Sequence, residues 1–232
     1  MGILSKRLSA LADMVEKNAR VIDVGTDHGM IPVFFALNGA CGRIIASDIR
    51  AGPLQSAIAN AAAHGVSSDI EFILSSGLEG VSAGEVDTVI IAGMGGETII
   101  SILNGAAWVK NKGIKLILQP QTKLFELLAW LRENGFSISG ATLVSEDGRL
   151  YTAFSAETDP CSPDGFFDIL IKKADPLLAK YLTQQIEKLQ REIRGKMTAA
   201  AAPDLEESRA RLETLVRVRS SVKEEYFNGN GK

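Results

Sequence analysis

The sequence predicts an α/β fold built on a largely parallel sheet and followed by an antiparallel helical hairpin. Three observations indicate this fold class. Short apolar runs alternate with helical patterns between residues 20 and 134, an Asp-Gly turn joins two extended runs at 136–157, and apolar residues recur every three or four positions over 178–222. With 232 residues, the chain is long enough for one α/β domain and a smaller second one.

Each expected strand is a short apolar run bounded by turn residues. The expected strands are 20–25, 43–48, 70–74, 87–92 and 115–118, and the expected helices are 31–38, 53–64, 97–103 and 123–134. A further helix is expected within the first 20 residues, where Leu4, Leu8, Leu11 and Val15 recur at helical spacing.

Residues 136–145 and 150–157 form an expected β-hairpin, because Asp147-Gly148 is a strong turn signal between extended runs. Alternating β-α units that end in a hairpin do not match a symmetric dinucleotide-binding fold. They indicate a Rossmann-like class I methyltransferase sheet of seven strands, with the last strand inserted antiparallel. We therefore expect this domain to span residues 1–158.

Residues 159–232 form the second expected domain, a helical coiled-coil-like hairpin that begins after the turn-rich stretch 159–163. Its two helical patterns are interrupted near Pro203. Residues 172–232 carry 13 Lys and Arg against nine Asp and Glu, whereas residues 1–171 carry 12 against 19. Two interpretations stay open: a hairpin that only packs on itself, or an arm that holds a large polyanion. The candidate residues for such an arm are Lys188, Arg191, Arg194, Arg209, Arg217 and Arg219.

The stretch Gly25-Thr-Asp-His-Gly29 is the most informative candidate site. A strand that ends in a glycine-rich turn before a helix can present backbone N–H groups to a nucleotide-like ligand. Asp27 would repel a pyrophosphate, but it suits a ligand with a cationic head, such as S-adenosylmethionine. Asp48 ends the next strand, where an acidic side chain accepts hydrogen bonds from ribose, although it could instead cap the following helix.

The strand at 87–92 runs into Gly93-Met-Gly-Gly96, where bare backbone allows close approach of a ligand. This segment lacks the Asn-Pro-Pro-Tyr or Asp-Pro-Pro-Tyr element that holds exocyclic amines, so a ring nitrogen is a candidate acceptor. Such a nitrogen needs no deprotonation before it attacks, which leaves positioning and charge stabilisation as the catalytic tasks. Asp27 is the candidate for stabilising the developing cation, and His28 for orienting the base or holding Asp27.

Two further strand ends carry candidate contacts. Gln119 could hydrogen-bond the edge of an adenine, and a structural amide is the alternative. Ser76 and Gly77 follow the strand at 70–74, at the place where this fold class holds the adenine of the cofactor.

Composition excludes several classes of protein. No run approaches the roughly 18 apolar residues of a membrane span, and the N-terminus lacks the features of a signal peptide. Cys41 and Cys161 form no Cys-x-x-Cys pair, and the chain has two histidines. We therefore expect a cytoplasmic protein without a metal site, and we expect a monomer.

Five motifs occur in the order found in one known family: Leu4-Ser-Lys-Arg-Leu8, Asp23-Val-Gly-Thr-Asp-His28 with Pro32, Ala92-Gly-Met-Gly-Gly96, Leu118-Gln-Pro120, and Glu146-Asp-Gly148 with Tyr151. With them, residues 3–157 resemble the bacterial tRNA (adenine-22-N1)-methyltransferases, the TrmK family. The resemblance implies methyl transfer from S-adenosyl-L-methionine to N1 of adenine 22 in the D-arm region of tRNA, with the helical hairpin helping to bind the tRNA. The implied cofactor or active-site positions are Arg7, Asp23, Gly25, Asp27, His28, Asp48, Ile49, Ser76, Gly77, Gly93 and Met94.

The chain departs from the family pattern at two positions. Met30 replaces an aromatic residue that could stack on the target base, an interaction worth about 1–3 kcal/mol per base. Ser76 replaces an aspartate that would accept from the adenine amine of the cofactor. We expect Met30 and Gly95 beside the substrate. An S-adenosylmethionine-dependent methyltransferase acting on another RNA position or on a small molecule stays the alternative.

Overall fold

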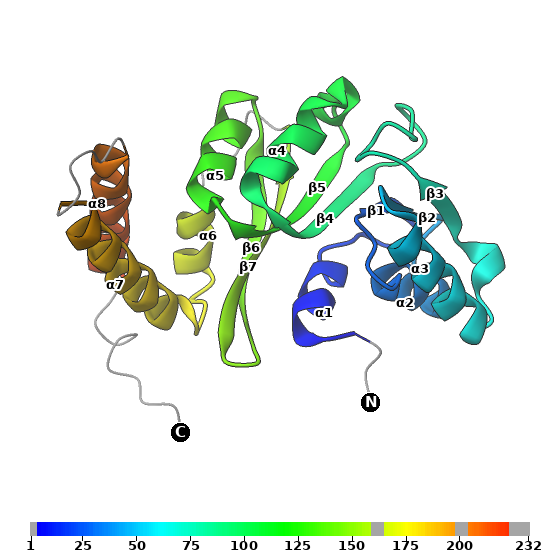
Figure 1. Ribbon diagram of the computed structural model, residues 1–232, viewed down its shortest axis with the longest axis horizontal. Helices are drawn as coiled ribbons and strands as arrows, with labels where there is room; N and C mark the ends of the chain where they lie inside the picture. Colours follow the sequence, from blue (N-terminus) through cyan, green and yellow to red (C-terminus); the bar gives the residue numbers. More distant parts are fainter. Residues whose placement is uncertain (1–3, 159–164, 198–203, 223–232) are drawn as a thin grey trace. The chain divides into compact units, whose positions relative to one another are not determined.

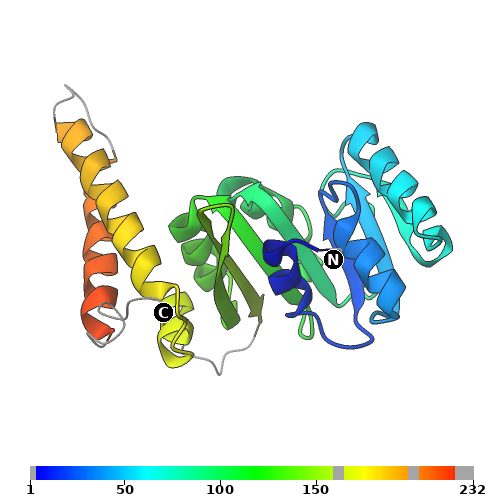
Figure 2. The same cartoon turned by 90° about the horizontal axis from the view of Figure 1, so that it is seen from below.

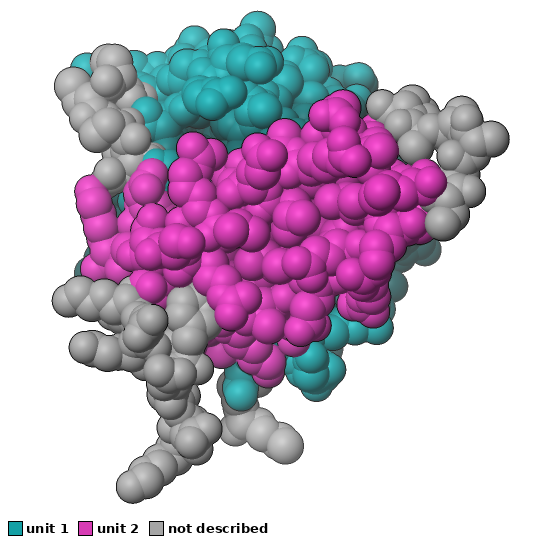
Figure 3. Space-filling view, turned by 90° about the vertical axis from the view of Figure 1, so that its left-hand side faces the viewer, with its two compact units in different colours: residues 1–166 teal, residues 167–232 magenta. Residues whose placement is uncertain are grey.

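The computed structural model describes residues 4–158, 165–197 and 204–222, and the chain divides into two compact units, residues 1–166 and 167–232 (Figure 3). The expected junction at 159–163 and the interruption near Pro203 lie outside the described residues.

The first unit is built on a seven-stranded sheet with the strand order β3-β2-β1-β4-β5-β7-β6 (Figure 1). Strands β1 to β5 run parallel to one another, and β7 runs antiparallel to both β5 and β6. This confirms the predicted seven-stranded sheet with an inserted antiparallel strand. The strands are β1 (Arg20–Val24), β2 (Arg43–Asp48), β3 (Glu71–Leu74), β4 (Thr88–Gly95), β5 (Lys115–Thr122), β6 (Ser137–Glu146) and β7 (Arg149–Glu157).

Five helices accompany this sheet: α1 (Lys6–Ala12), α2 (Met30–Asn38), α3 (Ala51–Ala63), α4 (Gly96–Asn104) and α5 (Leu124–Glu133). Two short 3-10 turns lie at Ser67–Asp69 and Ala107–Lys110. Helix α3 packs on β2 and β3, α4 packs on β4 and β5, and α1 packs against β5, β6 and β7. Central strand residues such as Ile22, Ile90 and Ile117 are fully buried, as expected for parallel strands that are covered on both faces.

The first helix is shorter than its apolar spacing predicts. Helix α1 ends at Ala12, and the chain then turns into β1 through Asn18, which has a φ of 63° and donates its N–H to the Ala40 carbonyl at 2.8 Å. Val15 still packs against the core without being helical. The apolar spacing therefore indicates that the whole stretch is packed against the core, but only the first half of the stretch is helical.

The second unit contains α6 (Phe166–Lys172), which begins at the boundary between the units, and the long helices α7 (Leu178–Met197) and α8 (Leu205–Ser221). Helices α7 and α8 pack side by side and antiparallel (Figure 2), as predicted for the helical hairpin. Their contact buries Leu182, Ile186 and Leu189 of α7 and Leu215 of α8. The sequence analysis missed α6.

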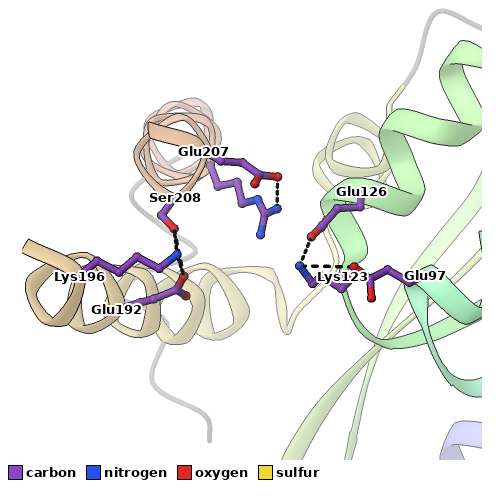
Figure 4. Close-up of polar contacts among 8 residues, drawn as sticks. Glu97, Lys123, Glu126, Glu192, Lys196, Glu207 and Ser208 are labelled. Atoms are coloured by element: carbon purple, nitrogen blue, oxygen red, sulfur yellow. Dashed lines mark hydrogen bonds and ion pairs between the residues drawn. The ribbon is translucent and has the colours of Figure 1, made fainter. Parts of the chain in front are cut away.

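A polar network lies in the α7–α8 contact (Figure 4). The Ser208 hydroxyl is buried, accepts from Lys196 Nζ at 3.0 Å and donates to Glu192 Oε1 at 3.0 Å. Lys196 also pairs with Glu192 at 2.8 Å, and this contact lowers the pKa of the Glu192 carboxyl. A polar group with satisfied partners in a helical pair favours one register over others.

The start of α4 is held tightly against the end of β5. Lys123 has a φ of 57°, and its Nζ lies 3.7 Å from Glu97 Oε1 and 3.0 Å from Glu126 Oε1 (Figure 4). A Cβ atom at Gly96 would lie 2.4 Å from the Lys123 carbonyl oxygen, which is closer than real Cβ contacts. Gly96 is therefore required by the packing of backbone against backbone.

Gly96→Ala is expected to lower the free energy of unfolding by about 1–3 kcal/mol, because the new methyl group would displace the backbone at Lys123. The matched control is Gly52→Ala in α3, where no heavy atom lies within 4 Å of the new Cβ. This change is expected to stabilise the fold by about 0.4–1 kcal/mol, since alanine restricts the unfolded chain. Urea unfolding of both variants measures the difference, and equal effects would contradict this account of Gly96.

Candidate cofactor and active site

The carboxyl ends of four parallel strands meet at one edge of the sheet. Val24 of β1 is in register with Ser47 of β2 and Ile91 of β4, and Asp48 of β2 is in register with Leu74 of β3. Neighbouring strands lie about 4.8 Å apart, so the turns that follow these strands are adjacent. The strand order reverses between β1 and β4, which is where ligands bind in open α/β sheets.

The turn after β1 directly contacts residues 93–95, the irregular end of β4, which form the β4 loop. Gly25 has a φ of 74°, and a Cβ atom there would lie 2.1 Å from Met94 Cε. The β4 loop therefore lies against the β1 turn, and the missing side chain of Gly25 makes room for it. The structure brings these two predicted site positions together.

The N–H groups of this turn are used differently from the prediction. Gly25 and Thr26 donate to the Ser47 carbonyl at 2.8 and 2.9 Å, and Asp27 donates to the Gly25 carbonyl at 2.9 Å. These three groups stabilise the turn and are not presented to a ligand. The turn carries the exposed carboxylate of Asp27 close to the buried Asp23, and carboxylates suit a cationic ligand better than a phosphate.

Two acidic side chains are buried beneath this edge, Asp23 on β1 and Asp48 on β2. Burial raises the pKa of Asp23 from 3.8 to about 6, and the negative charge of Asp48 adds to the shift. Asp48 Oδ1 accepts from the Arg50 N–H at 2.8 Å and lies 3.7 Å from Arg50 Nε. The carboxylates at this edge therefore repel one another, and a bound cationic group would reduce that repulsion.

Asp23 is expected to make the ligand-free fold less stable as the pH rises from about 4 to about 6. Its pKa is higher in the folded than in the unfolded chain, so the folded state holds the proton more tightly. The resulting stabilisation is complete below pH 4 and is lost as the pH rises through 6, an effect of about 3 kcal/mol. Asp23→Asn removes this dependence, so the stability of the variant relative to the parent should rise by about that amount between pH 4 and pH 7. Denaturant unfolding at both pH values measures it, and a constant difference would contradict it.

Asp27 and His28 project from the turn into solvent. Their side chains are 77% and 65% exposed, and His28 Nε2 lies 3.6 Å from Asp27 Oδ1. Asn60 of α3 supports them by donating to the His28 carbonyl at 2.8 Å, and its Nδ2 lies 3.5 Å from Met30 Sδ. Asn60 was not among the predicted site residues, although an amide side chain stands out in the alanine-rich helix α3.

The ends of β2 and β3 present apolar side chains to solvent. Ile49 is 67% exposed and Leu74 is 58% exposed, which is unusual for large apolar residues. Ser76 follows and is exposed, while Gly77 has a φ of 56° and lies against Ile102. Side chains of this kind can cover the faces of a flat ring beside Asp48. Leu74 was missed because an apolar residue in a strand predicts a core position.

Arg7 lies on the other side of the β4 loop. Its Nη1 donates to Gln119 Oε1 at 2.9 Å, its guanidinium carbon lies 5.6 Å from the Tyr151 ring centroid, and its backbone N–H donates to Glu146 at 3.2 Å. Gln119 is fully buried and also accepts from the Gly93 N–H at 3.2 Å. The structure therefore favours the open alternative of a structural amide, and a contact between Gln119 and a substrate stays a prediction.

The remaining predicted substrate contacts lie in two places. Gly95 ends β4 and pairs with Thr122 of β5, so it is at the sheet edge. Lys188, Arg191 and Arg194 lie on α7 in the second unit, where all three are exposed. Among residues 4–158, 165–197 and 204–222, no helix is long and apolar enough to span a membrane, and no group of ligating side chains could hold a metal ion.

Comparisons with known proteins agree with this geometry. Residues 4–154 match the family model described as a methyltransferase domain. A Bacillus subtilis strain 168 protein named tRNA (adenine(22)-N(1))-methyltransferase is 28% identical over 97% of this chain and 98% of its own length. The crystal structure of the B. subtilis m1A22 tRNA methyltransferase TrmK has 30% identity and a TM-score of 0.81, covering 93% of this chain and 98% of that one.

A Streptococcus pneumoniae protein, Sp1610, was solved in complex with S-adenosyl-L-methionine. It is 28% identical, has a TM-score of 0.78, and the match covers 93% of this chain and 99% of that one. The family model covers well over half of the chain, and the relatives align over almost their whole length. The chain therefore belongs to the methyltransferase domain family and, within it, to the TrmK family that its motifs resemble.

Proposed function

We propose that this protein is an S-adenosyl-L-methionine-dependent methyltransferase that modifies N1 of adenine 22 in tRNA. The observation that carries the proposal is the edge at which the β1 turn, the buried acids and the β4 loop meet, in a chain that aligns over its whole length with an enzyme named for this reaction. The edge has the strand arrangement at which α/β folds bind nucleoside ligands.

The residues at the edge fit this cofactor. In this proposal, Asp48 accepts from the ribose hydroxyls, and the exposed Ile49 and Leu74 cover the adenine. Asp23 and Asp27 supply negative charge for the cationic amino acid end, and Gly25 leaves room for the Met94 side chain. When bound, the cofactor supplies an electrophilic methyl group.

The chain's own residues have little covalent chemistry to perform. The N1 lone pair of adenine is free to attack, so no general base is needed, and the protein contributes by aligning the base. Adenine becomes cationic on methylation at N1, and Asp27 is an exposed carboxylate on the adjacent turn that can stabilise this charge. His28 lies within reach to orient Asp27.

The second unit is the proposed tRNA-binding arm. Lys188, Arg191 and Arg194 are spaced three residues apart on α7, so they project from one side of the helix. The apolar side of the same helix packs on α8, which leaves the basic side exposed. Lys and Arg at this spacing suit the phosphates of an RNA backbone. We propose that the protein acts in the cytoplasm and as a monomer, since one chain carries both parts.

A second candidate function is methylation of a different RNA position or of a small molecule by the same cofactor. Met30 favours it, because a half-buried methionine that lies against Asn60 occupies the place of the stacking aromatic residue. A weaker stacking contact would change the choice of base and leave the cofactor edge as it is.

The test is an incubation of the protein with S-adenosylmethionine and tRNA transcripts that carry adenine or guanine at position 22. Nuclease digestion and nucleoside mass spectrometry should detect 1-methyladenosine at position 22 only in the first transcript. Asp48→Ala should lose cofactor binding in calorimetry and product formation together. Cofactor binding without product on the adenine-22 transcript, together with methylation of other RNA, would favour the second candidate.

A further inference from the structure

Two glutamines near the end of β5 have different surroundings. Gln119 is fully buried, and its amide is committed to Arg7 Nη1, the Gly93 N–H and the Pro120 carbonyl. Gln121 lies two residues further along the strand, on the same face, and is exposed. Within the described part of the chain, no hydrogen bond involves the Gln121 amide. Gln121 therefore has donor and acceptor groups available for a ligand.

Gln121 lies beside the bare backbone of the β4 loop. Its Nε2 is 3.7 Å from the position that a Cβ atom would take at Gly93, and Arg7 Nη1 is 3.8 Å from the same position. Gly93 precedes Met94, the residue whose side chain reaches the Gly25 turn. The Gln121 amide is thus on the acceptor side of the loop, next to the edge assigned to the cofactor.

Methylation at N1 restricts how the protein can recognise the base. The N1 lone pair must stay free to attack, which leaves the edge formed by N6 and N7 available for recognition by hydrogen bonds. Glutamine is suited to this edge, because its oxygen accepts from the N6 amine while its nitrogen donates to N7. Guanine presents an oxygen in place of the amine, and this oxygen would face the amide oxygen of the glutamine.

The geometry points to Gln121 as a specificity-determining residue that binds the N6–N7 edge of the target adenine beside Gly93. Gln119 is then a positioning residue. It holds Arg7 and the β4 loop, and these two form the boundary of the site. The inference rests on the proposed function, and it adds the residue that distinguishes adenine from guanine.

The experiment measures single-turnover methylation, at saturating cofactor, of tRNA that carries adenosine or 7-deazaadenosine at position 22. The 7-deaza base keeps N1 and N6 but lacks the N7 acceptor. For the unaltered protein, the 7-deaza substrate should react roughly 5- to 10-fold more slowly, the loss of about one hydrogen bond. Gln121→Ala should slow the adenosine reaction by roughly 10- to 100-fold and show no further loss with the 7-deaza base.

The matched control is Gln55→Ala, an exposed glutamine of α3, which should behave like the unaltered protein on both substrates. Cofactor affinity and unfolding of Gln121→Ala should match the parent, which separates a base contact from a structural defect. If Gln121→Ala keeps the full 7-deaza effect, or reacts with adenosine at the parental rate, the assignment is overturned while the proposed function stands. If the unaltered protein binds cofactor but does not methylate adenosine 22, the proposed function fails and the assignment fails with it.

Discussion

Gly25→Ala is expected to weaken S-adenosylmethionine binding by roughly 10- to 100-fold, because the added methyl group displaces the end of the Met94 side chain toward the cofactor. The new methyl group would lie 2.1 Å from Met94 Cε, so the Met94 side chain has to move. We expect the displaced side chain to enter the edge between β1 and β4 that we assign to the cofactor. Isothermal titration calorimetry with S-adenosylmethionine measures the loss.

Gly39→Ala is the matched control for this prediction. Gly39 also has a positive φ, 57° against 74° for Gly25, but no heavy atom lies within 4 Å of its added Cβ. Both variants should lose about 1–2 kcal/mol of stability from the left-handed backbone conformation. Only Gly25→Ala should lose cofactor affinity. Equal affinity in the two variants would show that the cofactor does not depend on the contact between the β1 turn and the β4 loop.

Neutralising Lys188, Arg191 and Arg194 together to glutamine is expected to weaken tRNA binding by roughly tenfold or more and to leave cofactor binding unchanged. Each phosphate contact that is lost removes counterion release. The slope of log affinity against log salt concentration should therefore fall in magnitude by about 2–3. Filter binding of tRNA at several salt concentrations gives both quantities.

The control for charge alone neutralises three exposed cations of the first unit, Lys17, Lys112 and Arg132. Lys17 and Lys112 precede strands β1 and β5, so they lie at the amino ends of strands, away from the proposed site. This control has the same change in net charge and should keep the tRNA affinity of the parent. If the two triple variants lose affinity equally, general electrostatics explain the effect and α7 is not the arm.

The sequence predicted the strands well where each carries its own apolar run. The strand expected at 43–48 has the same bounds in the structure, and the inserted antiparallel hairpin is present. Boundaries failed where tertiary contacts decide them. Strand β5 continues to Thr122 because it pairs with the extended β4, and α6 has only seven residues. A short apolar stretch in such a helix gives no distinct periodicity.

For the candidate site, the sequence predicted which turns contribute residues, but it did not predict which of their side chains are buried. Gln119 and Gln121 are equivalent as residues in a Gln-Pro-Gln sequence. Their difference arises because Arg7, more than 110 positions away, takes up the amide of Gln119. The strand expected at 70–74 already ended at Leu74, but only the structure shows that the Leu74 side chain is exposed. Such distinctions depend on neighbours that no local pattern contains.

The contact between Arg7 and Glu146 joins residues 139 positions apart in the chain. During synthesis at the ribosome, α1 is made first but cannot find this partner until the hairpin of β6 and β7 has emerged. Gln119, the other partner of Arg7, also appears late. Long-range contacts of this kind slow folding because the intervening chain has to be closed into a loop first. Helix α1 therefore waits for strands made much later, and the wall of the site around Arg7 forms only after most of the first unit has been translated.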